Sequence, residues 1–299
     1  MWLKFLDTLT SSRFARTLAV SASLLFVALF GLTYIHWQRQ SSRGHQHYVR
    51  SRESRHGLSR LDDATLSRLC EESQRHLVAS SYSRWDLERN DPGAWREVER
   101  GIKRTEVLLP IAKRMTLESL RHLAADFRIP ADELRQAEGY INRIEKVVLD
   151  RELGNSAEVS EDFPAEIHIG PSFALDLTTD EDVALLLGHE LTHVATWGEG
   201  LSQFIDSVAQ GAQRAAGVYP TSAQREDLAC DFIGEQVAKR FIRSHPTDEP
   251  AGQRFARLLD YNCGSYSDED SDEEHMSQSE TLRALLGLDA ELGRLILKP

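Results

Sequence analysis

The chain has 299 residues, a formal net charge of −12 and 41% hydrophobic residues. This length is sufficient for one sizeable core or two small domains, and the acidic balance excludes a protein that binds nucleic acid over its whole surface. The three cysteines do not make the even set that is typical of a disulfide framework. Cys70 and Cys263 could pair in an oxidising compartment, and the number of subunits is left open.

Residues 17–37 form the first predicted element, a transmembrane helix that follows an N-terminal flank of residues 1–16. Residues 18–35 contain no charge, and their length suits one membrane crossing of about 20 residues. A cleaved signal peptide is the alternative, but no small-residue cleavage site follows the apolar run. We therefore expect a single-pass membrane protein.

A basic polar linker, residues 38–57, follows the predicted span. It holds five arginines, whereas three basic residues precede the span. The positive-inside rule therefore favours a cytoplasmic main domain, although both flanks are basic and the side is left open. The linker could lie on anionic lipid headgroups, or it could be a plain solvated segment.

Residues 58–150 have a helical pattern and are predicted to form a region that packs on the core. A first helix is expected to start at Leu61, and a second at Asp91, with proline in its first turn. Pro110 is expected to kink or break this second helix. A third helix opens at residue 130 and is expected to continue through Val148.

The remaining residues, 151–299, are predicted to form the functional core. Residues 165–169 alternate apolar and polar side chains, which predicts a short strand, and residues 175–177 could form a second one. A strand at the edge of a sheet could hold the backbone of a peptide by strand addition. Later helices are expected over residues 201–217, 221–241, 251–263 and 281–288.

The pattern H-E-x-x-H at residues 189–193 is the most informative part of the sequence. His189 and His193 are four residues apart, so on a helix both imidazoles lie on one face and can reach one metal ion. Glu190 lies beside the first of them, where a carboxylate can take a proton from a metal-bound water. This is the chemistry of a zinc-dependent peptidase.

The flanks of the motif indicate a buried helix. Thr179 is a suitable N-cap, three acidic residues follow it at the positive end of the helix dipole, and Gly198 marks the end. The residues on both sides of the motif are mostly apolar, and its two variable positions are uncharged. A solvated surface helix that happened to hold two histidines would carry charges there, so a metal site is favoured.

A catalytic zinc needs a third protein ligand and one open position. The helix that is expected to open near Thr221 offers Glu226, Asp227 and Asp231. Asp227 and Asp231 are four residues apart and share one face, so one could bind zinc while the other accepts the outer N–H of a ligand histidine. We favour Asp227 as the ligand, and Glu226 is the alternative.

The segment D-L-A-C-D at residues 227–231, together with H-E-x-x-H, resembles membrane-associated gluzincins of the M48 family (HtpX and Ste24 type) and the related M56 family (BlaR1 type). The resemblance extends over residues 167–288. In those families the glutamate of an E-x-x-x-D helix is the third zinc ligand. The resemblance therefore implies that Asp227 binds zinc and that Asp231 supports a histidine ligand, although this chain has aspartate where the families have glutamate.

The resemblance also implies a histidine and an arginine near the end of the core that stabilise the oxyanion. His275 and Arg283 could fill these places, although their spacing is longer than in the M48 family. The alternative for His275 is a solvated side chain beside the acidic stretch 267–274. A structural zinc is a further possibility, in which Cys230 or His275 would be a fourth protein ligand.

Together these features predict a mainly α protein with a small β element, in which a zincin-like (gluzincin) core lies behind one transmembrane helix. The expected function is that of a membrane-anchored zinc metalloendopeptidase with Zn2+ as cofactor, Glu190 as general base and a protein or peptide as substrate. The alternative is a non-catalytic or self-cleaving membrane-tethered sensor or scaffold that retains the zincin fold.

Overall fold

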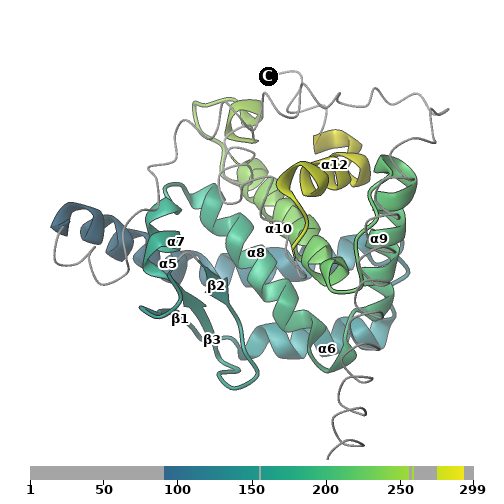
Figure 1. Ribbon diagram of the computed structural model, residues 1–299, viewed down its shortest axis with the longest axis horizontal. Coiled ribbons are helices and arrows are strands. Elements are labelled where there is room, and N and C mark those ends of the chain that lie inside the picture. The colour runs from purple at the N-terminus through teal and green to yellow at the C-terminus, as the bar shows by residue number, and fades with distance from the viewer. Residues whose placement is uncertain (1–90, 155, 256–257, 259–274, 293–299) are drawn as a thin grey trace, which may run out of the picture. The chain divides into compact units, whose positions relative to one another are not determined.

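The computed structural model describes residues 91–154, 156–255, 258 and 275–292, which all belong to the unit formed by residues 60–299 (Figure 1). The described residues are mainly helical and contain one small sheet, which confirms the broad part of the predicted fold class. The elements, in chain order, are α5 (Pro92–Leu123), α6 (Ala131–Arg143), β1 (Lys146–Leu149), β2 (Ala157–Glu158), β3 (Glu166–Ile169), α7 (Pro171–Asp176), α8 (Asp180–Thr196), the short turn η1 (Trp197–Glu199), α9 (Ser202–Ala216), α10 (Gln224–Ser244) and α12 (Gln278–Leu288).

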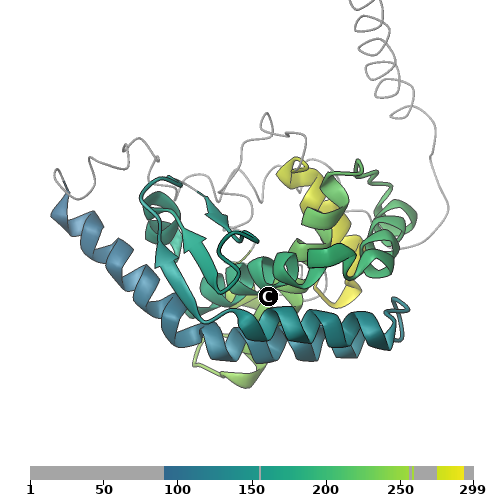
Figure 2. The same cartoon turned by 90° about the horizontal axis from the view of Figure 1, so that it is seen from below.

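Helices α8 and α10 lie side by side at the centre of this unit (Figure 1). Helix α5 packs against both of them, and α6 packs against α8. Helix α9 packs against α10 and pairs with α12. Figure 2 shows α5 and α12 on opposite sides of the central pair, α8 and α10. One hydrophobic core therefore joins the helices that precede the sheet to the helix that carries the motif.

Helix α8 begins where the sequence predicts. The hydroxyl of Thr179 accepts the backbone N–H of Asp182 at 3.2 Å, and the carboxylate of Asp182 accepts the backbone N–H of Thr179 at 2.8 Å. This reciprocal pair satisfies N–H groups that the first turn of a helix otherwise leaves without partners. Val183, Leu187 and Leu191 are fully buried, so the motif helix lies in the core and not on the surface.

The expected break at Pro110 is not found, because α5 continues without interruption to Leu123. Leu109 and Ala112, on either side of the proline, are buried against neighbouring elements. This packing outweighs the loss of one backbone hydrogen bond at the proline. The predicted start of α5 is confirmed, since the carboxylate of Asp91 accepts two backbone N–H groups of the first turn at 3.0 and 2.9 Å.

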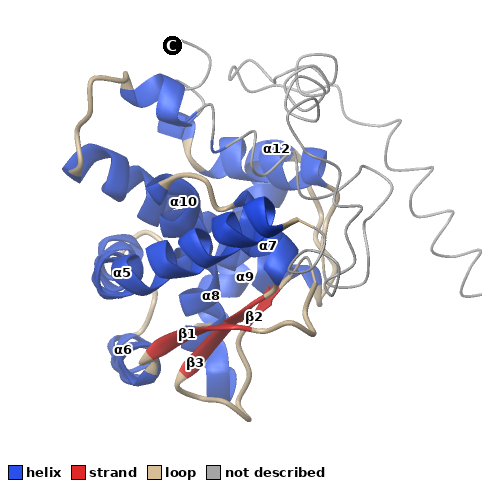
Figure 3. Cartoon of the chain, turned by 90° about the vertical axis from the view of Figure 1, so that its left-hand side faces the viewer, coloured by secondary structure: helices blue, strands red, loops and turns tan. Residues whose placement is uncertain are grey.

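The sheet has three strands in the order β1, β3, β2 (Figure 3). Strand β3 confirms the strand predicted over residues 165–169, but it lies in the middle of the sheet and not at its edge. Strand β1 pairs with it in parallel. Strand β2 pairs with it in antiparallel fashion, with Glu158 opposite His168 and Ala157 opposite Ile169. Within the described part of the chain, the edge on this side belongs to β2.

Two short segments differ from the sequence-based prediction. Val147 and Val148, expected at the end of the third helix, form β1, because α6 ends at Arg143 and these β-branched residues pair with β3. Leu175 and Asp176, expected in a strand, end α7, which starts at a proline whose fixed φ suits the first turn of a helix. Both segments are too short for periodicity to decide between helix and strand.

The helices predicted after the motif are confirmed where the structure describes them, as α9, α10 and α12. Before α10, Thr221 and Gln224 make a reciprocal pair of side-chain-to-backbone hydrogen bonds of 3.1 and 3.3 Å, near the predicted start of this helix. Of the helix predicted over residues 251–263, residues 251–255 are described, and they are helical.

The predicted transmembrane helix, residues 17–37, and the basic linker, residues 38–57, lie outside the described residues. Cys70, Cys263 and the helix expected to start at Leu61 lie outside them as well. In the part of the chain that is described, no helix has both the length and the apolar character that a membrane crossing requires.

We predict that replacing Asp176 with asparagine stabilises the protein at neutral pH. Burial, together with the charge of Asp182, raises the pKa of Asp176 to about 6. A carboxyl group with a raised pKa stabilises the fold below its unfolded-state pKa, and this contribution is lost as the pH rises through the folded-state value. The measurement is the midpoint of thermal unfolding of Asp176→Asn and of the wild type from about pH 4 to about pH 7.5. The midpoint of the variant, relative to that of the wild type, should rise as the pH increases. A difference that is constant over this range would contradict the prediction.

Candidate metal centre

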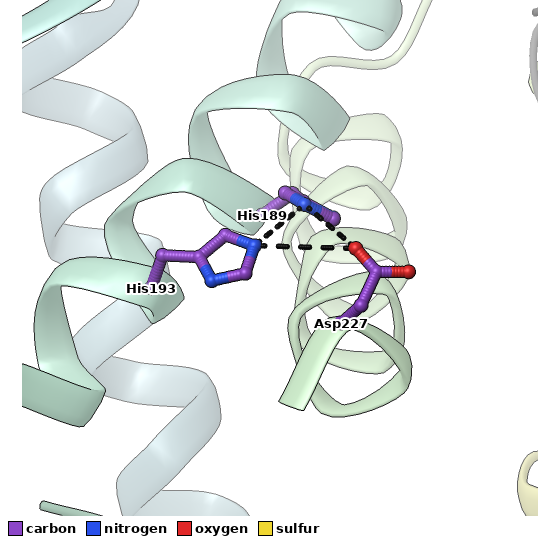
Figure 4. Close-up of side chains that lie close together, drawn as sticks. All are labelled: His189, His193 and Asp227. Carbon is purple, nitrogen blue, oxygen red and sulfur yellow. Dashed lines mark hydrogen bonds and ion pairs between the residues drawn. The ribbon is translucent and has the colours of Figure 1, made fainter. Parts of the chain in front are cut away.

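The two motif histidines lie on the face of α8 that meets α10. The Nε2 atoms of His189 and His193 are 3.1 Å apart. On α10, the Oδ1 atom of Asp227 lies 3.6 Å from Nε2 of His189 and 4.0 Å from Nε2 of His193. Figure 4 shows these three side chains converging from two helices. Their ligand atoms all lie within 4.8 Å of one another, so they could hold one metal ion.

The outer ring nitrogens of both histidines contact carboxylates. The Nδ1 atom of His189 lies 2.8 Å from Asp231, and the Nδ1 atom of His193 lies 3.0 Å from Glu226. The same carboxylate of Glu226 accepts the hydroxyl of Thr196 at 2.8 Å. When each Nδ1–H donates to its carboxylate, each Nε2 carries a lone pair, and the two lone pairs point to the same place.

This arrangement fits a zinc ion. Two nitrogen lone pairs that face each other at 3.1 Å repel, and a metal ion between them or a proton on one Nε2 removes this repulsion. Neighbouring ligand atoms of a tetrahedral zinc with bonds of about 2.0–2.1 Å are about 3.3 Å apart. The separations in this cluster, 3.1, 3.6 and 4.0 Å, lie on both sides of that value. Two imidazoles and one carboxylate also leave the open position that a catalytic zinc requires.

The geometry favours Asp227 over Glu226 as the third ligand. Asp227 is the carboxylate that faces the two Nε2 atoms. The carboxylate of Glu226 contacts the outer nitrogen of His193 and the hydroxyl of Thr196. Asp231 contacts His189 in the manner that the sequence predicts for the supporting acid. The two histidines therefore each have a carboxylate that fixes the orientation of the ring.

The electrostatics of this cluster favour a positive charge at its centre. Burial lowers the pKa of His189, but the hydrogen bond to Asp231 and the surrounding carboxylates raise it to about 10. Burial and the charge of Asp231 raise the pKa of Asp227 to about 6, against the opposing effect of the nearby histidines. Carboxylates gathered around buried imidazoles make a place that a cation stabilises.

A cavity of about 660 Å³ opens onto the cluster. Residues of β2 and α8 line it, together with residues of α10 and of the segment that leads into α12. Glu190 lines the same cavity and is 5% exposed. Within the described part of the chain it makes no hydrogen bond or ion pair. Its carboxylate therefore lies at the metal cluster and is not engaged by the protein.

The two oxyanion candidates differ in position. The Nε2 atom of His275 lies 3.9 Å from Oδ1 of Asp227, and His275 lines the cavity. Its carbonyl oxygen accepts the side-chain amide of Gln224 at 3.1 Å, which ties this segment to the start of α10. Arg283 lies on α12, but it is not among the residues that line the cavity. The structure therefore brings His275 to the cluster.

Two other candidate ligands lie outside the cluster of His189, His193 and Asp227. Cys230 is fully buried in α10, and burial raises the pKa of its thiol to about 12, so the thiol is protonated. His168 lies on β3, where its ring nitrogens contact Asp150 and Glu166 at 3.1 Å each.

Two parts of the cleft are missing from the sequence-based prediction. Strand β2 lines the cavity, but a strand of two residues has no periodicity that a sequence could reveal. Trp197 also lines it, one helical turn after His193. Its spacing of four residues from a ligand is a signal that could have indicated its place.

Helices α8 and α10 approach each other closely at two glycines. A Cβ atom at Gly188 would lie 2.9 Å from Cβ of Val237 and 3.0 Å from Cα of Gly234. A Cβ atom at Gly234 would lie 2.8 Å from the carbonyl oxygen of Leu185. Larger residues would therefore force the helices apart. This close approach explains how Asp227, one methylene shorter than glutamate, reaches histidines on the facing helix.

Comparisons of the chain with protein-family models, with curated proteins and with solved structures found no match. The resemblance to the M48 and M56 families therefore stays a prediction, and the assignment of the site depends on its geometry and its chemistry.

We predict that Gly234→Ala destabilises the protein by about 1–3 kcal/mol, the usual cost of extra volume in a well-packed contact, because the added methyl group would meet the carbonyl of Leu185. Zinc affinity should fall as well, because α8 and α10 carry different ligands. Gly139→Ala is the matched control, since nothing lies within 4 Å of its added Cβ in helix α6. The control should stabilise by about 0.5–1 kcal/mol. Equal effects of the two variants in denaturant unfolding would refute a tight contact at Gly234.

We predict that Asp227→Ala loses stoichiometric zinc, because it removes a ligand atom. Glu226→Ala should keep zinc but bind it about 10–100-fold more weakly, as is typical when the partner of a ligand histidine is removed. Metal analysis after dialysis against a competing chelator distinguishes the two. Full zinc in Asp227→Ala, combined with loss of zinc in Glu226→Ala, would reverse the assignment.

Proposed function

We propose that the chain is a membrane-anchored zinc metalloendopeptidase of the gluzincin type, similar to the M48 family. The observation that carries this proposal is the convergence of His189, His193 and Asp227 beside the unengaged carboxylate of Glu190 in one cleft. A structural zinc would need a fourth protein ligand. Among the described residues, the group that could hold one ion consists of His189, His193 and Asp227, with no fourth ligand.

The residues of the cleft have distinct roles in this proposal. When bound, zinc would acidify a coordinated water and polarise the carbonyl of the scissile peptide. Glu190 accepts the proton of the attacking water and passes it to the leaving amine. Asp231 and Glu226 hold the rings of His189 and His193 in the tautomer that leaves Nε2 free for the metal.

His275 is the proposed donor to the oxyanion. Its Nε2 atom lies 3.9 Å from Oδ1 of Asp227 and the residue lines the cavity, where the ring could donate a hydrogen bond to the developing negative charge. Arg283 is assigned the same role by the resemblance alone.

Strand β2 is the proposed binding strand for the substrate. It lies at the edge of the described sheet and lines the cleft, so the backbone on its outer side could pair with an extended peptide. The proposal transfers to β2 the role that the sequence suggests for residues 165–169.

Residues 17–37 are the proposed membrane anchor, and the charge of the flanks favours a cytoplasmic core.

We predict that Glu190→Gln retains zinc but cleaves about 10²–10⁴-fold more slowly, because it removes the general base and no ligand. Cleavage of casein by the full-length chain, with and without a chelator, is the measurement. Glu99→Gln, which changes an exposed glutamate on α5, is the control and should leave activity unchanged. A Glu190→Gln protein with full activity would contradict the mechanism, and a zinc-loaded wild type without activity would favour the sensor or scaffold alternative.

A further inference from the structure

The cleft carries more negative charge than a metal ion would balance. Five carboxylates line it, and no lysine or arginine is among the described residues that do so. A zinc ion would supply two positive charges, so the cleft stays negative with the metal bound. The five carboxylates belong to Glu158, Glu190, Glu226, Asp227 and Asp231.

Four of these carboxylates either contact the motif histidines or have a proposed catalytic role, but Glu158 does neither. Glu226, Asp227 and Asp231 contact the histidines. Glu190 is 5% exposed and lines the cavity without a hydrogen bond or ion pair to any described residue. Glu158 is exposed, and within the same part of the chain it too makes no hydrogen bond or ion pair. Both unengaged carboxylates are available to a ligand in the cleft.

The register of the sheet determines what Glu158 would meet. Glu158 lies opposite His168 in an antiparallel pair, so both side chains stand on the same face of the sheet. On β3 this is the partly exposed face, since Ile167 and Ile169 are buried on the other. A peptide added along the edge of β2 would place one of its side chains on this face, directly beside Glu158.

We propose that the cleft selects cationic peptides, and that Glu158 is the specificity-determining residue that pairs with a lysine or arginine side chain of the substrate. The inference rests on the proposed peptidase function, and it adds the chemical class of the substrate. Opposite charges at directly opposed positions of neighbouring strands attract, and like charges repel. An acidic peptide would in addition be repelled by the other carboxylates of the cleft, whose negative charge the metal does not balance.

The test uses otherwise neutral peptides that carry lysine, glutamine or glutamate at each position in turn, with the zinc-loaded full-length chain. At the position paired with Glu158, kcat/KM for lysine should exceed that for glutamine by up to about fivefold. The glutamate peptide should be cleaved most slowly, and the spread should shrink at high ionic strength. Equal cleavage of all three peptides at every position would overturn charge selection.

Variants at residue 158 test the assignment to this side chain. Glu158→Gln should flatten the preference, and Glu158→Lys should reverse it in favour of glutamate peptides, with zinc content unchanged. Glu161→Lys is the matched control, because it makes the same charge change at an exposed residue that does not line the cavity. The control should keep the preference of the wild type. An unchanged preference in Glu158→Lys would overturn the role of Glu158.

A binding measurement separates this inference from the proposed function. Fluorescence anisotropy with labelled peptides and zinc-loaded Glu190→Gln reports affinity without turnover. Tighter binding of lysine than of glutamate peptides, with no cleavage by the wild type, would leave charge selection standing and overturn the peptidase function. Cleavage by the wild type, with no difference in binding or in rate between lysine and glutamate peptides, would overturn charge selection and leave the peptidase function standing.

Discussion

The contact between α8 and α10 is the constraint on which the rest of the site depends. Gly188 and Gly234 have no side chains at the crossing, so the two backbones come within a distance that any Cβ atom would prevent. The motif histidines on α8 thereby face the carboxylates of α10. The packing of α5 and α6 on α8 holds the motif helix from the other side. A site made by two helices needs this rigid separation, because ligand geometry tolerates little error.

Carboxylates cluster along one face of α10. Asp227, Asp231 and Glu235 recur every four residues and so lie on one face of the helix. The first faces the Nε2 atoms of the histidines, and the second contacts an outer ring nitrogen. Burial, with the charges of Asp289 and Asp231, raises the pKa of Glu235 well above its usual value. Burial therefore favours the neutral form of this third carboxyl.

The cleft combines parts of the chain that are far apart in sequence. Strand β2 and the edge it offers lie before the motif helix, whereas His275 lies after α10 and is tied to its start by Gln224. Three of the five carboxylates that line the cleft orient or face imidazoles, which leaves Glu158 and Glu190 unengaged by the described residues. The proposed substrate preference follows from this division, because the unbalanced charge lies where a bound peptide would pass.

The sequence by itself determined the features that depend on local spacing. The face shared by His189 and His193 and the cap at Thr179 follow from helical periodicity and capping chemistry. The same periodicity favours Asp227 as the third ligand but leaves Glu226 as the alternative. Only the tertiary structure decided which strand is the edge of the described sheet and that His275 reaches the cluster. Those outcomes depend on pairing and packing between distant segments, which a one-dimensional pattern does not encode.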